Sequence, residues 1–153
     1  MKIGKELTGI KFVLNNNNAV DCKDFKGKNL IVYFYPKDDT PGCTKEAIDF
    51  STNKKKFSNL NTHIIGVSKD DLKKHTKFKD KHDLNIDLAS DEDLIICKKF
   101  GVWVEKSMYG KKYMGIERAT FLFNKDLKLL KKWNNVKVKG HVDDILSFLS
   151  TLT

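Results

Sequence analysis

The segment YPKDDTPGCTKE, residues 35–46, contains the side chain best suited to covalent chemistry, the thiol of Cys43. A continuous apolar and β-branched run ends just before this segment, and a helical spacing of apolar residues follows Cys43. We therefore expect Cys43 in the first turn of a helix, where the helix dipole and unpaired backbone N–H groups favour a thiolate. The thiolate is the nucleophilic form of cysteine, so the pattern predicts a reactive thiol.

Arg118 is the candidate cation for this thiolate. It is the only arginine among 29 basic residues, and it directly precedes the apolar run ATFLF, residues 119–123, which is predicted to be a strand. A helix terminus contributes only about 1 kcal/mol to holding a negative charge, so a neighbouring cation must contribute more. A guanidinium can hold a thiolate and an oxygen atom together, whereas an ammonium is a single point charge. Arg118 is therefore predicted to lie beside Cys43.

Thr40 and the two prolines, Pro36 and Pro41, shape the loop that leads to Cys43. Thr40 stands three residues before the cysteine, so its hydroxyl can turn back toward the sulfur or toward a bound ligand. Proline restricts the backbone, and both prolines are expected to stiffen the loop and keep bulk water from the thiolate. Each feature also has an ordinary reading, since threonine is a common helix cap and an isolated cysteine is commonly a small core residue.

Strands alternate with helices along the chain, which predicts an α/β fold in which helices flank a mixed central sheet. The expected strands are residues 11–14 and 19–22, a hairpin around a turn at 15–18, and then 29–35, 62–68, 119–123 and 127–133. The expected helices are 43–60, 70–82, a short helix capped by Ser90 and ending at Phe100, and 140–149. This order is typical of the thioredoxin-like fold, with the hairpin as an N-terminal extension. No linker or repeat interrupts the chain, so one domain is expected over residues 1–153.

Charge and apolar patterning exclude several classes of protein. The formal net charge is +9, but the lysines are spread along the chain among acidic residues, and arginine forks are nearly absent. We therefore expect no nucleic-acid partner. The N-terminus has no signal-like segment, and no apolar run approaches the roughly 18 residues that span a bilayer. A cytoplasmic protein without a membrane partner is predicted.

The three cysteines, Cys22, Cys43 and Cys97, are expected to be free thiols. Their number is odd, and a chain of this length needs no disulfides to stabilise its core. The chain has no Cys-x-x-Cys motif, and its four histidines have no ligand spacing to the cysteines, so no metal site is predicted.

The active-site segment YFYPKDDTPGCTKEA is similar to that of the peroxiredoxins, and most similar to that of the bacterioferritin comigratory protein, or peroxiredoxin Q, subfamily. The subfamily pattern Pro-x-x-x-Thr-x-x-Cys corresponds to Pro36, Thr40 and Cys43, and the distal arginine corresponds to Arg118 in GIERATF. The segments DFKGKNLIVYFYP, HIIGVSKD and FGVWVEKSMYGKKYMGIER and the C-terminal helix extend the resemblance over nearly the whole chain.

The resemblance implies reduction of hydrogen peroxide and organic hydroperoxides at Cys43, in antioxidant defence and redox homeostasis. Cys43 would attack one peroxide oxygen and become a sulfenic acid. The Thr40 hydroxyl, the Cys43 backbone N–H and Arg118 would stabilise the developing charge, and Pro36 would shield the sulfur. Glu46 would orient Arg118, although a solvated helix residue is the plain alternative. No cofactor is implied.

The chain departs from the family pattern at the resolving cysteine. The position five residues after Cys43 is Ile48, and residues 78–79, where other members have this thiol, contain no cysteine. The leading interpretation is a one-cysteine cycle, in which thioredoxin, glutaredoxin or glutathione attacks the sulfenic acid. A two-cysteine cycle with Cys97 as the resolving thiol is the alternative, and Cys22 is expected to be a bystander. A monomer is expected from the subfamily.

Two other classes of protein stay open on the sequence alone. A thiol–disulfide oxidoreductase would normally have Cys-x-x-Cys, and Thr40 occupies the first position of that spacing. A lysine-rich binding protein or holdase is the second alternative. Reduction of insulin would reveal a thiol–disulfide oxidoreductase. Retention on heparin at about 0.5 M salt would support a lysine-rich binding protein.

Overall fold

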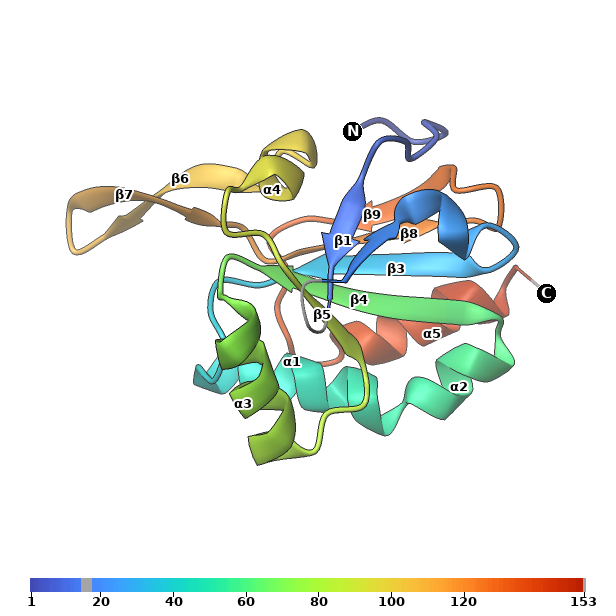
Figure 1. Ribbon diagram of the computed structural model, residues 1–153, viewed down its shortest axis with the longest axis horizontal. Helices are drawn as coiled ribbons and strands as arrows, with labels where there is room; N and C mark the ends of the chain where they lie inside the picture. The colour runs from blue at the N-terminus through green and yellow to red at the C-terminus, as the bar shows by residue number, and fades with distance from the viewer. Residues whose placement is uncertain (15–17, 153) are drawn as a thin grey trace.

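The computed structural model describes residues 1–14 and 18–152 and contains a seven-stranded mixed sheet (Figure 1). The strand order is β2-β1-β5-β4-β3-β8-β9. The strands are β1 (Lys11–Val13), β2 (Ala19–Asp21), β3 (Asn29–Phe34), β4 (Thr62–Ser68), β5 (Asp87–Ser90), β8 (Ala119–Phe123) and β9 (Leu129–Trp133). Strands β3, β4 and β5 run parallel, whereas β8 pairs antiparallel with β3. The predicted thioredoxin-like fold with an N-terminal hairpin is confirmed.

Helices cover both faces of the sheet (Figure 1). One side holds α1 (Pro41–Thr52), α2 (Lys54–Asn59), α3 (Leu72–His82) and α5 (His141–Ser150). The other side holds α4 (Ile95–Lys99) and the short 3₁₀ helix η2 (Cys22–Phe25). In the described part of the chain, no helix has the length and apolar character needed to cross a membrane.

Alternate residues of β3 contribute to two separate core layers. Leu30, Val32 and Phe34 pack on the side of α4 and η2, and Ile31 and Tyr33 pack on the side of α1 and α5. Successive side chains of a strand point to opposite faces, so a run that is apolar throughout requires cover on both sides. The continuous apolar character of this strand therefore reflects its central place in the sheet.

The single helix predicted over 43–60 is two helices, and it begins two residues earlier, at Pro41. Pro41 suits the first helical position, because its missing N–H would have had no acceptor there. The break falls at Asn53, whose side-chain Nδ2 donates to the carbonyl of Asp49 at 2.8 Å. This bond competes with the backbone bond to the same carbonyl and favours an end to the helix.

The prediction that Ser90 caps a helix is wrong. Ser90 is the last residue of β5 and pairs with Ser68 of β4. The carboxylate of Asp91 instead accepts hydrogen bonds from the backbone N–H groups of Ile96 and Cys97, at 3.0 and 2.8 Å, near the start of α4. The buried strand pairing outweighs the local preference of a serine for a cap.

A two-stranded hairpin of β6 (Trp103–Met108) and β7 (Lys111–Ile116) extends from the body of the molecule and was not predicted (Figure 1). Most of its side chains are exposed or half-buried, so the sequence shows no regular alternation of apolar and polar residues. Strand β9 starts at Leu129, two residues later than expected, because Leu127 has a left-handed backbone with φ 61°. Of the predicted turn at 15–18, residues 15–17 lie outside the described residues.

Candidate active site

The start of α1 determines the environment of the Cys43 thiol. Thr40 is the N-cap, and the first hydrogen bond of the helix runs from the Thr44 N–H to the Thr40 carbonyl at 2.8 Å. Cys43 therefore lies in the first turn, as predicted, where backbone N–H groups have no acceptor within the helix. The residue is only 2% exposed. A negative charge on this sulfur is stabilised by the positive end of the helix dipole.

Strand pairing brings Arg118 to this helix start. The antiparallel register places Phe34, at the end of β3, opposite Ala119, at the start of β8. The loop after β3 and the residue before β8 therefore meet at the same edge of the sheet. This pairing bridges a separation of 75 residues between Cys43 and Arg118.

The Arg118 guanidinium contacts two side chains of α1 at once. Nη1 donates to Glu46 Oε1 at 2.8 Å, and Nη2 donates to Cys43 Sγ at 3.2 Å. Gly42 leaves room for this approach, since a Cβ at that position would lie 3.3 Å from Nη2. A forked donor can make both contacts, whereas a lysine ammonium cannot reproduce this geometry.

Burial and the neighbouring charges act in opposite directions on the pKa of each partner, and the net effect raises both pKa values. Burial raises the pKa of Glu46 to about 7, and the nearby Arg118 opposes this shift. Burial would lower the pKa of Arg118, but the negative charges of Glu46 and Cys43 outweigh it and raise that pKa. The second oxygen of Glu46, Oε2, is buried without a hydrogen-bond partner among the described residues. Arg118 therefore stays cationic while the charge of Glu46 changes near neutral pH.

The buried Glu46 carboxyl predicts a specific dependence of stability on pH. Because its pKa is higher in the folded chain (about 7) than its ordinary value of 4.5, the folded state binds the proton more tightly. The resulting stabilisation is complete below about pH 4.5 and is lost as pH rises through about 7. Between pH 5 and 8, we expect the free energy of unfolding of the wild type to fall by about 2–3 kcal/mol more than that of Glu46→Gln.

Urea unfolding at several pH values measures this difference. The wild type and Glu46→Gln share every other titrating group, so the difference between their pH profiles reports on Glu46. Parallel pH profiles for the two proteins would show that Glu46 keeps its ordinary titration. Glu105→Gln is a matched control, because it makes the same substitution at a carboxylate of β6 that is 59% exposed and does not act on the pKa of Glu46. It is expected to keep the pH dependence of the wild type.

Two other basic side chains lie near the guanidinium. Burial, with a smaller contribution from the charge of Arg118, lowers the pKa of His141 to about 4, so this imidazole is neutral at pH 7. It shares a hydrogen bond of 2.7 Å with the Thr120 hydroxyl. Burial and the charge of Arg118 lower the pKa of Lys106, whereas Cys43 raises it. Of these three basic groups, Arg118 is the one that contacts the sulfur.

The other two predicted residues of the loop are close to Cys43 along the chain. Thr40 is half-buried, and its hydroxyl donates to the carbonyl of Lys37 at 3.0 Å rather than to the sulfur. Pro36 is half-buried and follows the buried Tyr35 at the end of β3. The structure thus brings Cys43, Glu46 and Arg118 into contact and places Thr40 and Pro36 in the adjoining loop.

Cys22 and Cys97 are buried in the core layer on the opposite face of the sheet from Cys43. Burial, and secondarily Asp91, raises the pKa of the Cys97 thiol well above its ordinary value. Burial likewise raises the pKa of Cys22, whose Sγ lies 3.7 Å from the carbonyl oxygen of Leu7. A thiol with a raised pKa is a poor nucleophile near pH 7, so these two cysteines differ chemically from a thiol that contacts an arginine.

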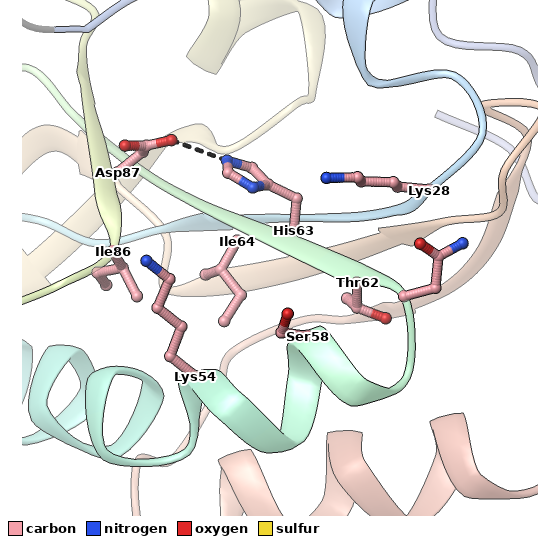
Figure 2. A pocket seen from close by; sticks show the side chains of 9 residues that line it. Lys28, Lys54, Ser58, Thr62, His63, Ile64, Ile86 and Asp87 are labelled. Carbon is pink, nitrogen blue, oxygen red and sulfur yellow. Dashed lines mark hydrogen bonds and ion pairs between the residues drawn. The ribbon is translucent and has the colours of Figure 1, made fainter.

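A polar pocket lies at the other end of the parallel strands, where β4 begins (Figure 2). Within it, Nε2 of His63 lies 2.8 Å from Oδ2 of Asp87, and this hydrogen bond lowers the pKa of Asp87. Lys54 also lines the pocket and donates to the carbonyl of Asn85 at 2.7 Å. The pocket contains no thiol and is separate from the site of Cys43.

Sequence reasoning missed Asp38, in the loop before α1, and His75, in α3, which are both buried and bonded to each other. One signal was available, since His75 precedes Phe78 by three residues and so falls on the apolar face of α3.

Known proteins resemble both the sequence and the fold. The AhpC/TSA family model matches residues 3–132. Peroxiredoxin Bcp of Bacillus subtilis is 44% identical over 153 residues, covering 100% of this chain and 98% of the relative. Peroxiredoxin Bcp of Escherichia coli K12 is 41% identical and covers 91% of this chain and 90% of the relative.

Solved structures agree with these relatives. A cysteine-to-serine mutant of Xylella fastidiosa PrxQ has a TM-score of 0.94 and 36% identity, covering 99% of this chain and 97% of that one. The bacterioferritin comigratory protein of Xanthomonas campestris, described for its alkyl peroxide reduction activity, has a TM-score of 0.90 and 36% identity, with coverage of 97% and 98%. The chain therefore belongs to the AhpC/TSA family, and within it to the peroxiredoxins of the Bcp, or PrxQ, type. It is a thiol-dependent peroxidase.

Proposed function

We propose that Cys43 is the peroxidatic thiolate of this enzyme and that Arg118 activates both the thiolate and the bound peroxide. The contact of 3.2 Å between Arg118 Nη2 and Cys43 Sγ is the observation that carries this assignment. Glu46 positions the guanidinium through Nη1. The backbone N–H of Cys43 is a further donor, and the Thr40 hydroxyl becomes one when it turns from the Lys37 carbonyl toward the peroxide. Pro36 shields the sulfur.

In the first step, the Cys43 sulfur attacks one oxygen of the peroxide ROOH in line with the O–O bond. An S–O bond forms, the O–O bond breaks, and two electrons pass from sulfur to the peroxide. The leaving RO⁻ takes a proton from solvent and departs as an alcohol, or as water when the substrate is hydrogen peroxide. The thiolate becomes a sulfenic acid. Arg118 stabilises the negative charge that spreads over the sulfur and both oxygens.

For the return to thiolate, we propose a one-cysteine cycle with an external thiol. The first thiol attacks the Cys43 sulfenic acid, releases water and forms a mixed disulfide, and a second thiol displaces Cys43 from it. The location of the cysteines supports this cycle, because Cys97 and Cys43 lie in core layers on opposite faces of the sheet. A disulfide requires Cα atoms roughly 4.4–6.8 Å apart, so one of these residues would have to leave its layer.

The substrates proposed are hydrogen peroxide and organic hydroperoxides, which agrees with the alkyl peroxide reduction described for the Xanthomonas campestris protein. The proposed reductants are thioredoxin, glutaredoxin or glutathione, each of which supplies the external thiol. We propose that the enzyme works as a monomer in the cytoplasm.

The one-cysteine cycle predicts that the Cys22→Ala/Cys97→Ala double variant turns over peroxide with glutathione or thioredoxin within about twofold of the wild-type rate. Both thiols are buried away from Cys43, so each replacement should lower the free energy of unfolding by about 1 kcal/mol and leave the catalytic rate unchanged. Intact-mass analysis with thiol alkylation after one equivalent of peroxide checks the intermediate. The expected product in the wild type carries one added oxygen on Cys43. Loss of two hydrogens, with Cys97 no longer alkylated, would show a two-cysteine cycle instead.

A further inference from the structure

A buried hydrogen-bond network joins the loop before Cys43 to helix α3. Oδ2 of Asp38, in the loop, lies 2.6 Å from Nδ1 of His75 in α3, and the two side chains are 5% and 3% exposed. The hydroxyl of Tyr35 donates to the other oxygen of Asp38 at 2.6 Å. The backbone N–H of Asp38 donates to the carboxylate of Asp70 at 2.8 Å. Asp38 thus bonds to α3 through His75, to the segment before α3 through Asp70, and within its own segment to Tyr35.

The partners of His75 determine where the protons lie. Nε2 of His75 lies 3.0 Å from the carbonyl oxygen of Ala89, which can only accept, so Nε2 carries a hydrogen. Nδ1 lies 2.6 Å from the Asp38 carboxyl group, and a contact this short needs one proton between the two atoms. The pair therefore shares one proton, either as imidazolium and carboxylate or as imidazole and carboxylic acid. Loss of either partner would leave a polar group buried without its bond.

The loop that contains Asp38 leads directly into the helix turn that contains Cys43. It contains Thr40, the N-cap of α1, and so places the first turn of that helix. Cys43 is 2% exposed and contacts Arg118, so an external thiol can reach a sulfenic acid there only after the loop or the first turn moves. The peroxide step needs the closed loop, whereas the thiol step needs an open one.

We propose that Asp38 and His75 form a latch that keeps the loop closed over Cys43 and thereby sets the balance between the peroxide step and the thiol step. Both are positioning residues that act through the loop, and the inference rests on the one-cysteine cycle proposed above. Breaking the latch should slow reaction with peroxide, because the donors around the sulfur lose their alignment. The same change should speed attack by an external thiol, because the open loop exposes the sulfenic acid.

A second contact between the same loop and helix provides a matched control. The carboxylate of Asp39 lies 2.7 Å from Nζ of Lys81 and 2.8 Å from Nε2 of His82, and its side chain is 42% exposed. Exposed ion pairs contribute little to stability. Asp39 has φ 61°, a backbone conformation that asparagine tolerates well, so Asp39→Asn removes only the surface pair. This variant is expected to keep both rates.

The test measures the two steps separately in His75→Ala, Asp38→Ala, Asp38→Asn and Tyr35→Phe. Stopped-flow mixing with hydrogen peroxide gives the first rate, and mixing of the pre-formed sulfenic acid with glutathione, followed by mass analysis, gives the second. For the two alanine variants we expect the peroxide rate constant to fall about 10-fold to 100-fold and the thiol rate constant to rise. For Asp38→Asn, we expect both rate constants to lie within about threefold of the wild-type values. An amide at position 38 can donate to Nδ1 of a neutral His75 and still accept from Tyr35, so every bond of the pair is kept.

Opposite changes in the two rates, with rescue in Asp38→Asn, support the latch, since general destabilisation would lower both together. Unchanged rates, or a parallel fall in both, would overturn it. Tyr35→Phe removes one hydrogen bond to Asp38 and keeps the aromatic ring. It should therefore lower the peroxide rate constant and raise the thiol rate constant by smaller factors than the alanine variants do. It tests the latch even where an alanine variant does not fold. Wild type and Cys43→Ser run in the same assay. A Cys43→Ser protein that reduces peroxide would contradict the proposed function itself, independently of the latch.

Discussion

Cys43→Ser is expected to lower the rate constant for peroxide reduction by at least about 1,000-fold. A serine hydroxyl is not ionised near pH 7 and does not give a stable oxidised product with peroxide, so the nucleophile and the intermediate are both lost. The guanidinium of Arg118, 3.2 Å from the wild-type sulfur, can still donate a hydrogen bond to the serine oxygen. The fold should therefore be kept, and the loss should appear in chemistry alone.

Peroxide consumption at saturating glutathione measures this effect, and thermal unfolding of the same sample checks the fold. Cys97→Ser is a matched control, because it makes the same substitution at a cysteine in the other core layer. It is expected to reduce stability, since it buries a hydroxyl, while the folded protein keeps its peroxidase activity. Peroxide reduction by Cys43→Ser at the wild-type rate would place the reactive group elsewhere.

Arg118→Lys is expected to reduce the rate constant for peroxide reduction by about 100-fold to 1,000-fold, although the charge is conserved. The wild-type guanidinium bonds Glu46 and Cys43 through separate nitrogens at 2.8 and 3.2 Å. A single ammonium cannot keep both bonds and also stabilise charge on the peroxide oxygens. It would also leave the buried carboxyl of Glu46 without its forked partner, which favours the neutral form of that group.

Second-order rate constants from stopped-flow measurements with hydrogen peroxide test this prediction. Lys112→Ala is a suitable control, because Lys112 is a well-exposed cation on the β6–β7 hairpin and its loss lowers the net charge, whereas Arg118→Lys leaves the net charge unchanged. Its rate should match the wild type at moderate ionic strength, where long-range charge effects are screened. An Arg118→Lys enzyme within about threefold of the wild type would mean that charge alone is sufficient and that the fork is not needed.

Much of the fold could be predicted wherever the residues of one strand or helix show its burial in their own order of apolar and polar types. Strands β3, β4 and β8 are buried on both faces, and their continuous apolar runs indicate this directly. Strand β5 has four residues and depends on pairing with β4, so its local pattern is too short to identify it. The β6–β7 hairpin buries few side chains, and its sequence therefore lacks the alternation that marks a half-buried strand.

The candidate site shows the same division. A cysteine near a helix start, a loop with both prolines and a lone arginine before a strand are local features, so the sequence by itself determined which residues to consider and predicted their chemistry. Tertiary structure decided their contact, because the antiparallel pairing of β3 with β8 brings Arg118 to a helix start 75 residues away. It also decided that Cys97 lies across the sheet from Cys43, and that Asp38 meets His75. These relations join residues far apart in the chain, and only the packing of strands and helices sets them.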